Sequence, residues 1–197
     1  MSDTVTRALP GMHSPAAGFD APFEVLAGCH ERVRRSLALL ERLLSHLSQQ
    51  GLDAAARSAA RDVWRYFELA APQHHLDEER HVIPRLLASG DAELMAAGRQ
   101  MRGDHERMDA VWATLGPALL ALADEPTDGM LPTARWQALA LDTQRFIGLH
   151  DTHVPLEDAL AFPAAMARTD ASARAAMGRE MAERRGVAPP DGPATAG

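Results

Sequence analysis

The chain has 197 residues, with 27 acidic and 20 basic side chains and a formal net charge of −7. This excess of negative charge disfavours a general nucleic-acid surface, which needs cationic groups to contact phosphates. All basic residues are arginines, and lysine and asparagine are absent. The composition therefore excludes lysine Schiff bases, Walker-type phosphate sites and asparagine-dependent nucleophile systems. Nine histidines stand against a single cysteine, so imidazole is the side chain to follow.

Both ends of the chain lack the periodic apolar residues of a folded segment. Residues 1–18 and 187–197 contain several prolines and glycines, and we expect them to be flexible. The N-terminus has neither the basic start nor the apolar run of a signal peptide, and no apolar stretch reaches the length of a membrane span. One cysteine, Cys29, cannot form an intramolecular disulfide. These features predict a cytoplasmic protein without membrane contact.

Three helix-breaking stretches divide residues 19–168 into four long segments. They are Gln49–Gly51, Ala88–Asp91 and Asp124–Pro132, each rich in turn-forming residues. In the first segment, the residues expected to face the core recur at alternating steps of four and three, which is the period of one helix face. They are Leu26, His30, Val33, Leu37, Leu40, Leu44 and Leu47. One histidine thus interrupts an apolar stripe.

The other three segments carry stripes of the same period. The second is polar in its middle: Trp64, Phe67, Ala71, His74, Glu78 and His81. The third again has one histidine: Met101, His105, Met108, Trp112, Leu115, Leu119 and Leu122. The fourth is again polar in its middle: Leu139, Thr143, Phe146, His150, His153, Glu157 and Leu160. Four amphipathic helices with short connections predict an all-α, up-down-up-down four-helix bundle.

An additional C-terminal helix is expected after the bundle, within residues 169–186. Asp170 is a suitable N-cap, and the helix should run from about Thr169 to Arg185. We expect Met177 and Met181 to face the bundle.

The two halves of the chain repeat one pattern, His…His-x3-Glu-x5-Pro. The first copy is His30, His74, Glu78 and Pro84, and the second is His105, His153, Glu157 and Pro163. A spacing of four places the histidine and the glutamate of each pair on one helix face, one turn apart. Two ligands from one helix can reach one metal ion in this way.

Chain lengths predict that the repeated residues share one level of the bundle. His30 lies 20 residues before Gln50, and His74 lies 21 residues after Asp53, so at about 1.5 Å per residue they are level. Burying such groups without partners would cost several kcal/mol for each charge. Imidazole and carboxylate ligands suit iron, manganese or zinc. We therefore predict a two-ion site: one ion on His30 and His74, the other on His105 and His153, with Glu78 and Glu157 shared.

At these residues the chain resembles the hemerythrin-like family, which has a His-His-Glu cation-binding pattern. The resemblance covers roughly residues 20–165, and its most specific strings are His74–Pro84 and His153–Pro163. It implies a non-haem di-iron centre with two iron ions, an oxo or hydroxo bridge, and an open position for dioxygen, nitric oxide or peroxide. It also favours iron over zinc.

One position departs from the dioxygen-carrying members of that family. Those members have two histidines four apart on the third helix, whereas Met101 and Asp109 stand four residues from His105. We expect His75 to supply the missing imidazole, because other branches of the family use the position after the preceding histidine. The altered donor set is as consistent with redox chemistry or sensing as with dioxygen carriage.

The remaining candidates have two open interpretations. His81 and His150 either pack ordinarily or orient the ligands. The Cys29 thiol is expected to be buried rather than ligating, and His13 and His46 are expected in the tail and on the surface. Four aromatic residues either wall the site or serve only as core: Trp64, Phe67, Trp112 and Phe146. Two acidic residues are either solvated or hydrogen-bonded to ligands: Glu79 and Asp158.

Three functions from different classes follow from the pattern and the resemblance. The first is a protein that binds or senses dioxygen or nitric oxide. The second is a di-iron oxidoreductase acting on peroxide, and the third is iron storage or donation. The sequence leaves open whether the protein is an enzyme and whether two copies form a homodimer.

Overall fold

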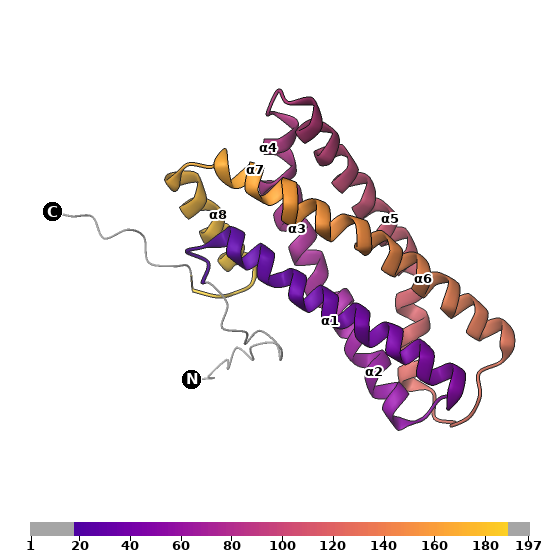
Figure 1. Cartoon of the computed structure of the whole chain (residues 1–197). Coiled ribbons are helices and arrows are strands. Elements are labelled where there is room, and N and C mark those ends of the chain that lie inside the picture. Colours follow the sequence, from indigo (N-terminus) through magenta and orange to yellow (C-terminus); the bar gives the residue numbers. More distant parts are fainter. Residues whose placement is uncertain (1–17, 189–197) are drawn as a thin grey trace, which may run out of the picture.

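The computed structural model describes residues 18–188, which are helical for most of their length (Figure 1). Residues 1–17 and 189–197 lie outside the described residues, and with them His13 and most of the two ends for which we expect flexibility. The elements in chain order are α1 (Pro22–Gln49), α2 (Ala54–Arg65), the π-helix η1 (Tyr66–Ala70), α3 (Ala71–His81), α4 (Ile83–Leu87), α5 (Ala92–Asp124), α6 (Thr133–Leu156), the π-helix η2 (Glu157–Ala161), α7 (Phe162–Ala167) and α8 (Ala171–Arg184).

Aspartates begin three of the helices. Asp53, Asp91 and Asp170 are in extended conformation, and each side chain accepts a hydrogen bond from a backbone N–H of the first turn. Such N-caps satisfy donors that have no partner inside the helix. The helix predicted from about Thr169 to Arg185 is confirmed as α8, with the cap at Asp170.

The connection between α1 and α2 is tied to the connection between α5 and α6. Leu52 and Gly129 exchange two backbone hydrogen bonds, of 2.7 and 3.0 Å. Gly51 has a φ of +78°, and a Cβ atom there would lie 2.6 Å from the carbonyl oxygen of Gly129. Glycine is therefore required at this turn on both grounds. The contact fixes the end of the bundle farthest from the candidate metal centre.

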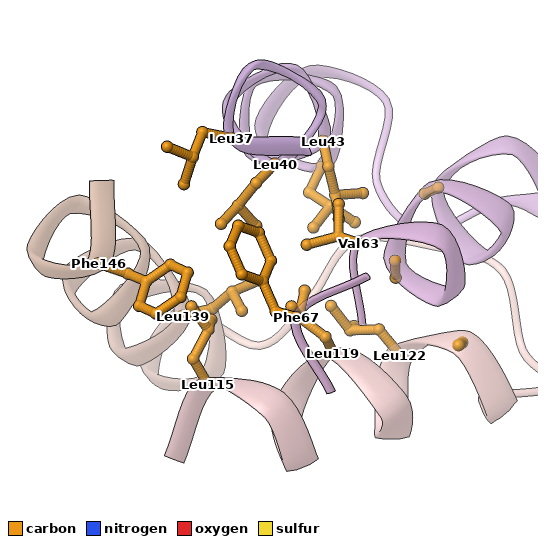
Figure 2. Close-up of a cluster of buried hydrophobic side chains, with 14 of the residues drawn as sticks. Leu37, Leu40, Leu43, Val63, Phe67, Leu115, Leu119, Leu122, Leu139 and Phe146 are labelled. Atoms are coloured by element: carbon orange, nitrogen blue, oxygen red, sulfur yellow. The ribbon is translucent and has the colours of Figure 1, made fainter. Parts of the chain in front are cut away.

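The bundle is a closed ring in which α1 packs against α2 and α6, and α5 packs against the same two helices. Figure 1 shows α1 and α6 running side by side. The all-α bundle with an additional C-terminal helix is confirmed. Figure 2 shows Phe67 among leucines of α1, α5 and α6, with Val63 of its own segment nearby. These apolar side chains provide most of the burial that holds the helices together.

One member of the predicted first stripe is wrong. Leu43 is 3% exposed and belongs to the core, whereas Leu44 is only partly buried. The helix has 3.6 residues per turn, so a step of three or of four keeps a side chain on nearly the same face. Because α1 contacts α2 as well as α6, Leu43 and not Leu44 points into the core.

Two π-helical turns interrupt the second and fourth bundle segments, each directly before an Ala-Pro or Phe-Pro pair. Ala71 donates its N–H to the carbonyl of Tyr66, and Phe162 donates to the carbonyl of Glu157, both five residues back. The prolines that follow have no N–H and would clash with the carbonyl four residues back in a regular helix. Such wide turns are frequent at functional sites, and Glu157 is the first residue of η2.

The C-terminal helix α8 closes the end of the bundle that carries the candidate centre. Met177 and Met181 are buried in the second apolar cluster, as predicted. Arg184 and Arg185 both contact the fully buried carboxylate of Asp77 on α3, the latter at 2.6 Å. This carboxylate is directly before Glu78 in the chain, so α8 braces the segment that presents the glutamate.

None of the helices between residues 18 and 188 combines the length and the apolar composition that a bilayer span requires.

Candidate metal centre

The structure brings all seven predicted ligands together. They come from α1, α3, α5, α6 and the first residue of η2, and their side chains meet inside the bundle. Six of them are at most 5% exposed, and His75 is half-buried. The residues therefore lie at one height along the bundle, as the chain lengths between them predict.

The seven residues form two groups that share a glutamate. The first group is His30, His74, Glu78 and Glu157; the second is His75, Glu78, His105 and His153. Within each group, one ligand atom per residue lies within 4.8 Å of every other. Ligands of a common cation have this separation, because metal–ligand bonds are about 2.0–2.2 Å long for such donors.

Each glutamate has one oxygen near each group. Glu157 places Oε2 3.0 Å from Nε2 of His30 and Oε1 2.8 Å from Nε2 of His153. Glu78 places Oε1 3.1 Å from Nε2 of His74 and Oε2 3.3 Å from Nε2 of His105. Both carboxylates therefore have the placement of bridging ligands between two ions.

The inward atoms are short of partners within the protein. Nε2 of His30 and all four carboxylate oxygens of Glu78 and Glu157 are buried and make no hydrogen bond of acceptable geometry. Buried polar atoms without partners are rare because they cost about 1–3 kcal/mol each. Two cations would satisfy all five atoms at once, so the donor set fits a pair of metal ions.

Outer carboxylates fix the orientation of three imidazoles. Nδ1 of His30 lies 2.6 Å from Oδ1 of Asp158, and Nδ1 of His105 lies 3.0 Å from Oε1 of Glu79. Nδ1 of His153 lies 3.4 Å from Oδ2 of the buried Asp104. A proton on Nδ1 that is donated to a carboxylate leaves the lone pair of Nε2 free for a metal.

Burial and neighbouring charges shift the titration of the centre. Burial lowers the pKa of His74 and of His75, and the nearby imidazoles lower both pKa values further. Burial, followed by the charge of Glu157, raises the pKa of Glu78. Burial alone would also raise the pKa of Glu157, but contacts with two histidines lower it below its ordinary value. Cations bind neutral imidazoles and ionised carboxylates. The lowered pKa values of His74, His75 and Glu157 favour these forms, whereas the raised pKa of Glu78 favours its protonated form. Burial alone would lower the pKa values of His105 and His153, but contacts with glutamates raise both.

His75 lies parallel to His105. Their ring centroids are 4.2 Å apart with an interplanar angle of 12°. His75 thus contributes an imidazole to the second group from α3. No second imidazole comes from α5, because that helix has no histidine four residues from His105. Spacing on one helix could not place it there, because adjacent helix residues point about 100° apart.

The other histidines separate into different environments. His150 is 4% exposed, and its Nδ1 donates to the carbonyl of Phe146 at 2.8 Å. His81 contacts Glu180 of α8 at 2.8 Å, and His46 contacts Asp53 at 3.0 Å. None of these three is in either group.

Two functional neighbours were missed by sequence reasoning. Asp104 supports His153 from another helix, and Asp77 is the buried anchor of α8. Their partners are 49 and about a hundred residues away in the chain, so helical spacing gives no signal for either. The predicted wall residues are partly found: Phe67, Trp112 and Phe146 line a cavity of about 170 Å³ beside His75, whereas Trp64 is not among its lining residues.

Comparisons with known proteins agree with this geometry. A family model described as hemerythrin HHE cation binding domain matches residues 21–165, a range that contains every residue of both groups. A protein of Haemophilus influenzae (strain ATCC 51907 / DSM 11121 / KW20 / Rd), described as an uncharacterized protein, is 29% identical over 174 residues. The matched region is 87% of this chain and 94% of that protein.

Proposed function

The chain belongs to the hemerythrin HHE cation-binding domain family, and on this premise we propose that it is a non-haem di-iron protein that binds or senses a small diatomic ligand. The observation that carries the proposal is the pair of His/Glu groups joined by two glutamates whose buried oxygens make no hydrogen bond of acceptable geometry. That the protein is metal-binding follows from the family and the donor set. The identity of the metal as iron, and of the small ligand as dioxygen or nitric oxide, is our proposal.

The assignment of ligands follows the two groups. His30 and His74 would hold one ion, and His75, His105 and His153 would hold the other. Glu78 and Glu157 would bridge the pair. A pair of iron ions, when bound, supplies reversible redox chemistry and a coordination position for a small ligand. His75 is half-buried whereas the other six residues are buried, so the side of the centre nearest to solvent is at His75.

Three outer carboxylates would keep the imidazoles in place. Glu79, Asp104 and Asp158 each accept from an Nδ1–H and so hold the ring with Nε2 toward the centre. Partners of this kind raise ligand basicity and fix the tautomer.

The surroundings of the centre would restrict water. Phe67, Met108 and Phe146 are at most 4% exposed and line the cavity next to His75. Such apolar walls would limit the access of solvent and charged species to the His75 side of the centre, while a small neutral gas could pass.

Spectroscopy of the reduced protein tests this function. The visible spectrum of anaerobic, reduced protein should change on exposure to dioxygen or nitric oxide and should return on degassing or re-reduction. His75→Gln is expected to weaken the response, whereas His46→Gln, at the far end of α1, should leave it intact. If no gas alters the spectrum of the reduced protein, the proposed function is wrong.

A second candidate, action on peroxide, is supported by His150. Its imidazole lies on the cavity wall, where it could accept a hydrogen bond from a neutral peroxide. Oxygen evolution from hydrogen peroxide, compared between the unchanged protein and Glu78→Ala, tests this candidate. Equal rates in the two proteins would dismiss it. Cytoplasmic placement and homodimerisation stay predictions.

A further inference from the structure

The cavity beside His75 is larger than a diatomic gas requires. Its volume is about 170 Å³, and a cavity of about 150 Å³ with apolar walls holds benzene. A molecule of two atoms would occupy only a small part of this space. The cavity therefore has room for an organic molecule of about six or seven heavy atoms.

The walls favour an apolar, flat body. Phe67 and Phe146 meet edge to face with centroids 4.8 Å apart, and Trp112 lies 5.4 Å from each of them. Met108, which is 1% exposed, adds a polarisable thioether. Aromatic rings prefer edge-to-face or offset contacts with one another, and methionine sulfur packs well against rings.

His150 provides one hydrogen-bond acceptor in these walls. Its Nδ1–H is donated to the carbonyl of Phe146 at 2.8 Å, so the neutral ring keeps its lone pair on Nε2. Burial is the main reason that the pKa of His150 is lowered to about 4, so the ring is neutral at pH 7. The indole N–H of Trp112 is already donated to Glu68 at 2.9 Å. The cavity thus offers an acceptor to a ligand that carries a hydroxyl donor.

The entrance of the cavity is acidic and disfavours anionic ligands. Glu68 and Asp109 are exposed acidic members of the lining. Two carboxylates at the entrance repel anions, and the chain as a whole carries a net charge of −7. A neutral molecule enters without this penalty.

We propose that the cavity bounded by Phe67, Met108, Trp112, Phe146 and His150 binds a small neutral molecule with a benzene-sized apolar body and one hydroxyl group, which donates to Nε2 of His150. The ligand class goes beyond a diatomic gas. It depends on the cavity alone, and it stands whichever ions the two neighbouring groups bind.

Calorimetric titration of the full-length, metal-loaded protein with three matched probes tests the proposal. Phenol has the body and the hydroxyl, toluene has the body alone, and benzoate carries a carboxylate charge on the same ring. We expect one phenol per chain, with toluene bound about fivefold more weakly, since a hydrogen bond contributes about 1 kcal/mol and a factor of ten is 1.4 kcal/mol. Benzoate should also bind more weakly than phenol, because the two carboxylates at the entrance repel its charge. Absence of saturable phenol binding, or equal binding of benzoate, overturns the proposal.

Variants locate the binding. His150→Phe removes the acceptor at similar volume and should lower phenol affinity to that of toluene, while toluene affinity changes less than about twofold. Ala71→Met places a longer side chain into the cavity and should abolish binding of both probes. His46→Phe, outside the cavity, is the matched control and should change neither affinity. Unchanged phenol binding in folded His150→Phe overturns the proposal; if that variant does not fold, unchanged binding in Ala71→Met does so.

Discussion

Asp158 supports the imidazole of His30 from the other half of the chain: its Oδ1 lies 2.6 Å from Nδ1 of His30, although 128 residues separate the two. The reciprocal contact joins Glu79 and His105 at 3.0 Å. In each case, the carboxylate directly after one of the two repeated glutamates, Glu157 or Glu78, contacts the first histidine of the opposite repeat. Each half of the duplicated pattern therefore orients a predicted ligand of the other half.

Replacing Asp158 with asparagine should weaken the first ion specifically. The amide keeps the size of the side chain but loses the charge that orients His30, and losses of this kind lower metal affinity by about 10- to 100-fold. Chelator competition followed by metal analysis measures the affinity. Asp151→Asn, an exposed change on α6, is the control. Equal affinities in the two variants would contradict the orienting role of Asp158.

His75→Gln should remove the second ion and spare the first. His75 belongs to the group with His105 and His153 and not to the group with His30, so the metal content should fall from two ions per chain to one. The matched control is His81→Gln, since His81 contacts Glu180 and lies in neither group. Retention of two ions with unchanged affinity in His75→Gln would show that His75 is no ligand.

Asp77→Asn should destabilise the fold. The carboxylate is fully buried, and its two partners, Arg184 and Arg185, have side chains only 15% and 12% exposed. Removing one partner of such a cluster leaves buried charge uncompensated, and we expect a loss of about 2–3 kcal/mol in the free energy of unfolding. Urea denaturation measures it. Glu183→Gln, an exposed change on α8 beside the arginine partners of Asp77, should cost under about 0.5 kcal/mol; a similar loss in both variants would contradict this account.

Glu180 should contribute to the acid sensitivity of the protein. Burial opposes ionisation, but contacts with Arg184, His81 and Arg80 lower its pKa from 4.5 to about 2. Because the folded-state pKa lies below the unfolded one, the stabilisation is fully present above about pH 4.5 and is lost as the pH falls toward 2.

The corresponding variant is Glu180→Gln. It should be less stable than the unchanged protein at pH 7, and the difference between the two should shrink as the pH is lowered from 5 to 2.5. Unfolding midpoints across this range provide the measurement. A constant difference at every pH would mean that Glu180 acts through packing and not through its charge.

The bundle and the composition of the candidate site could be predicted because both depend on spacing within helices. The steps of three and four that identify Leu26 or Met101 as inward also identify His30 and His105 as intruders in the same stripes. The His-x3-Glu pairs of α3 and α6 follow from the same period.

Contacts between helices could not be predicted in this way. Asp104 meets His153, and Asp77 meets Arg185, only because helices far apart in sequence pack together. The π-helical turns depend on how Pro72 and Pro163 are accommodated, and a proline pattern alone does not distinguish a π turn from a kink. The choice of Leu43 over Leu44 likewise depends on which neighbours α1 contacts.

Metal analysis of the purified protein tests the di-iron centre most directly, with visible spectra recorded in the oxidised and reduced states. The two groups that share Glu78, together with the bridging placement of Glu157, predict two iron ions per chain and a visible absorption that changes on reduction. One zinc ion per chain, with no visible absorption in either state, would contradict the account.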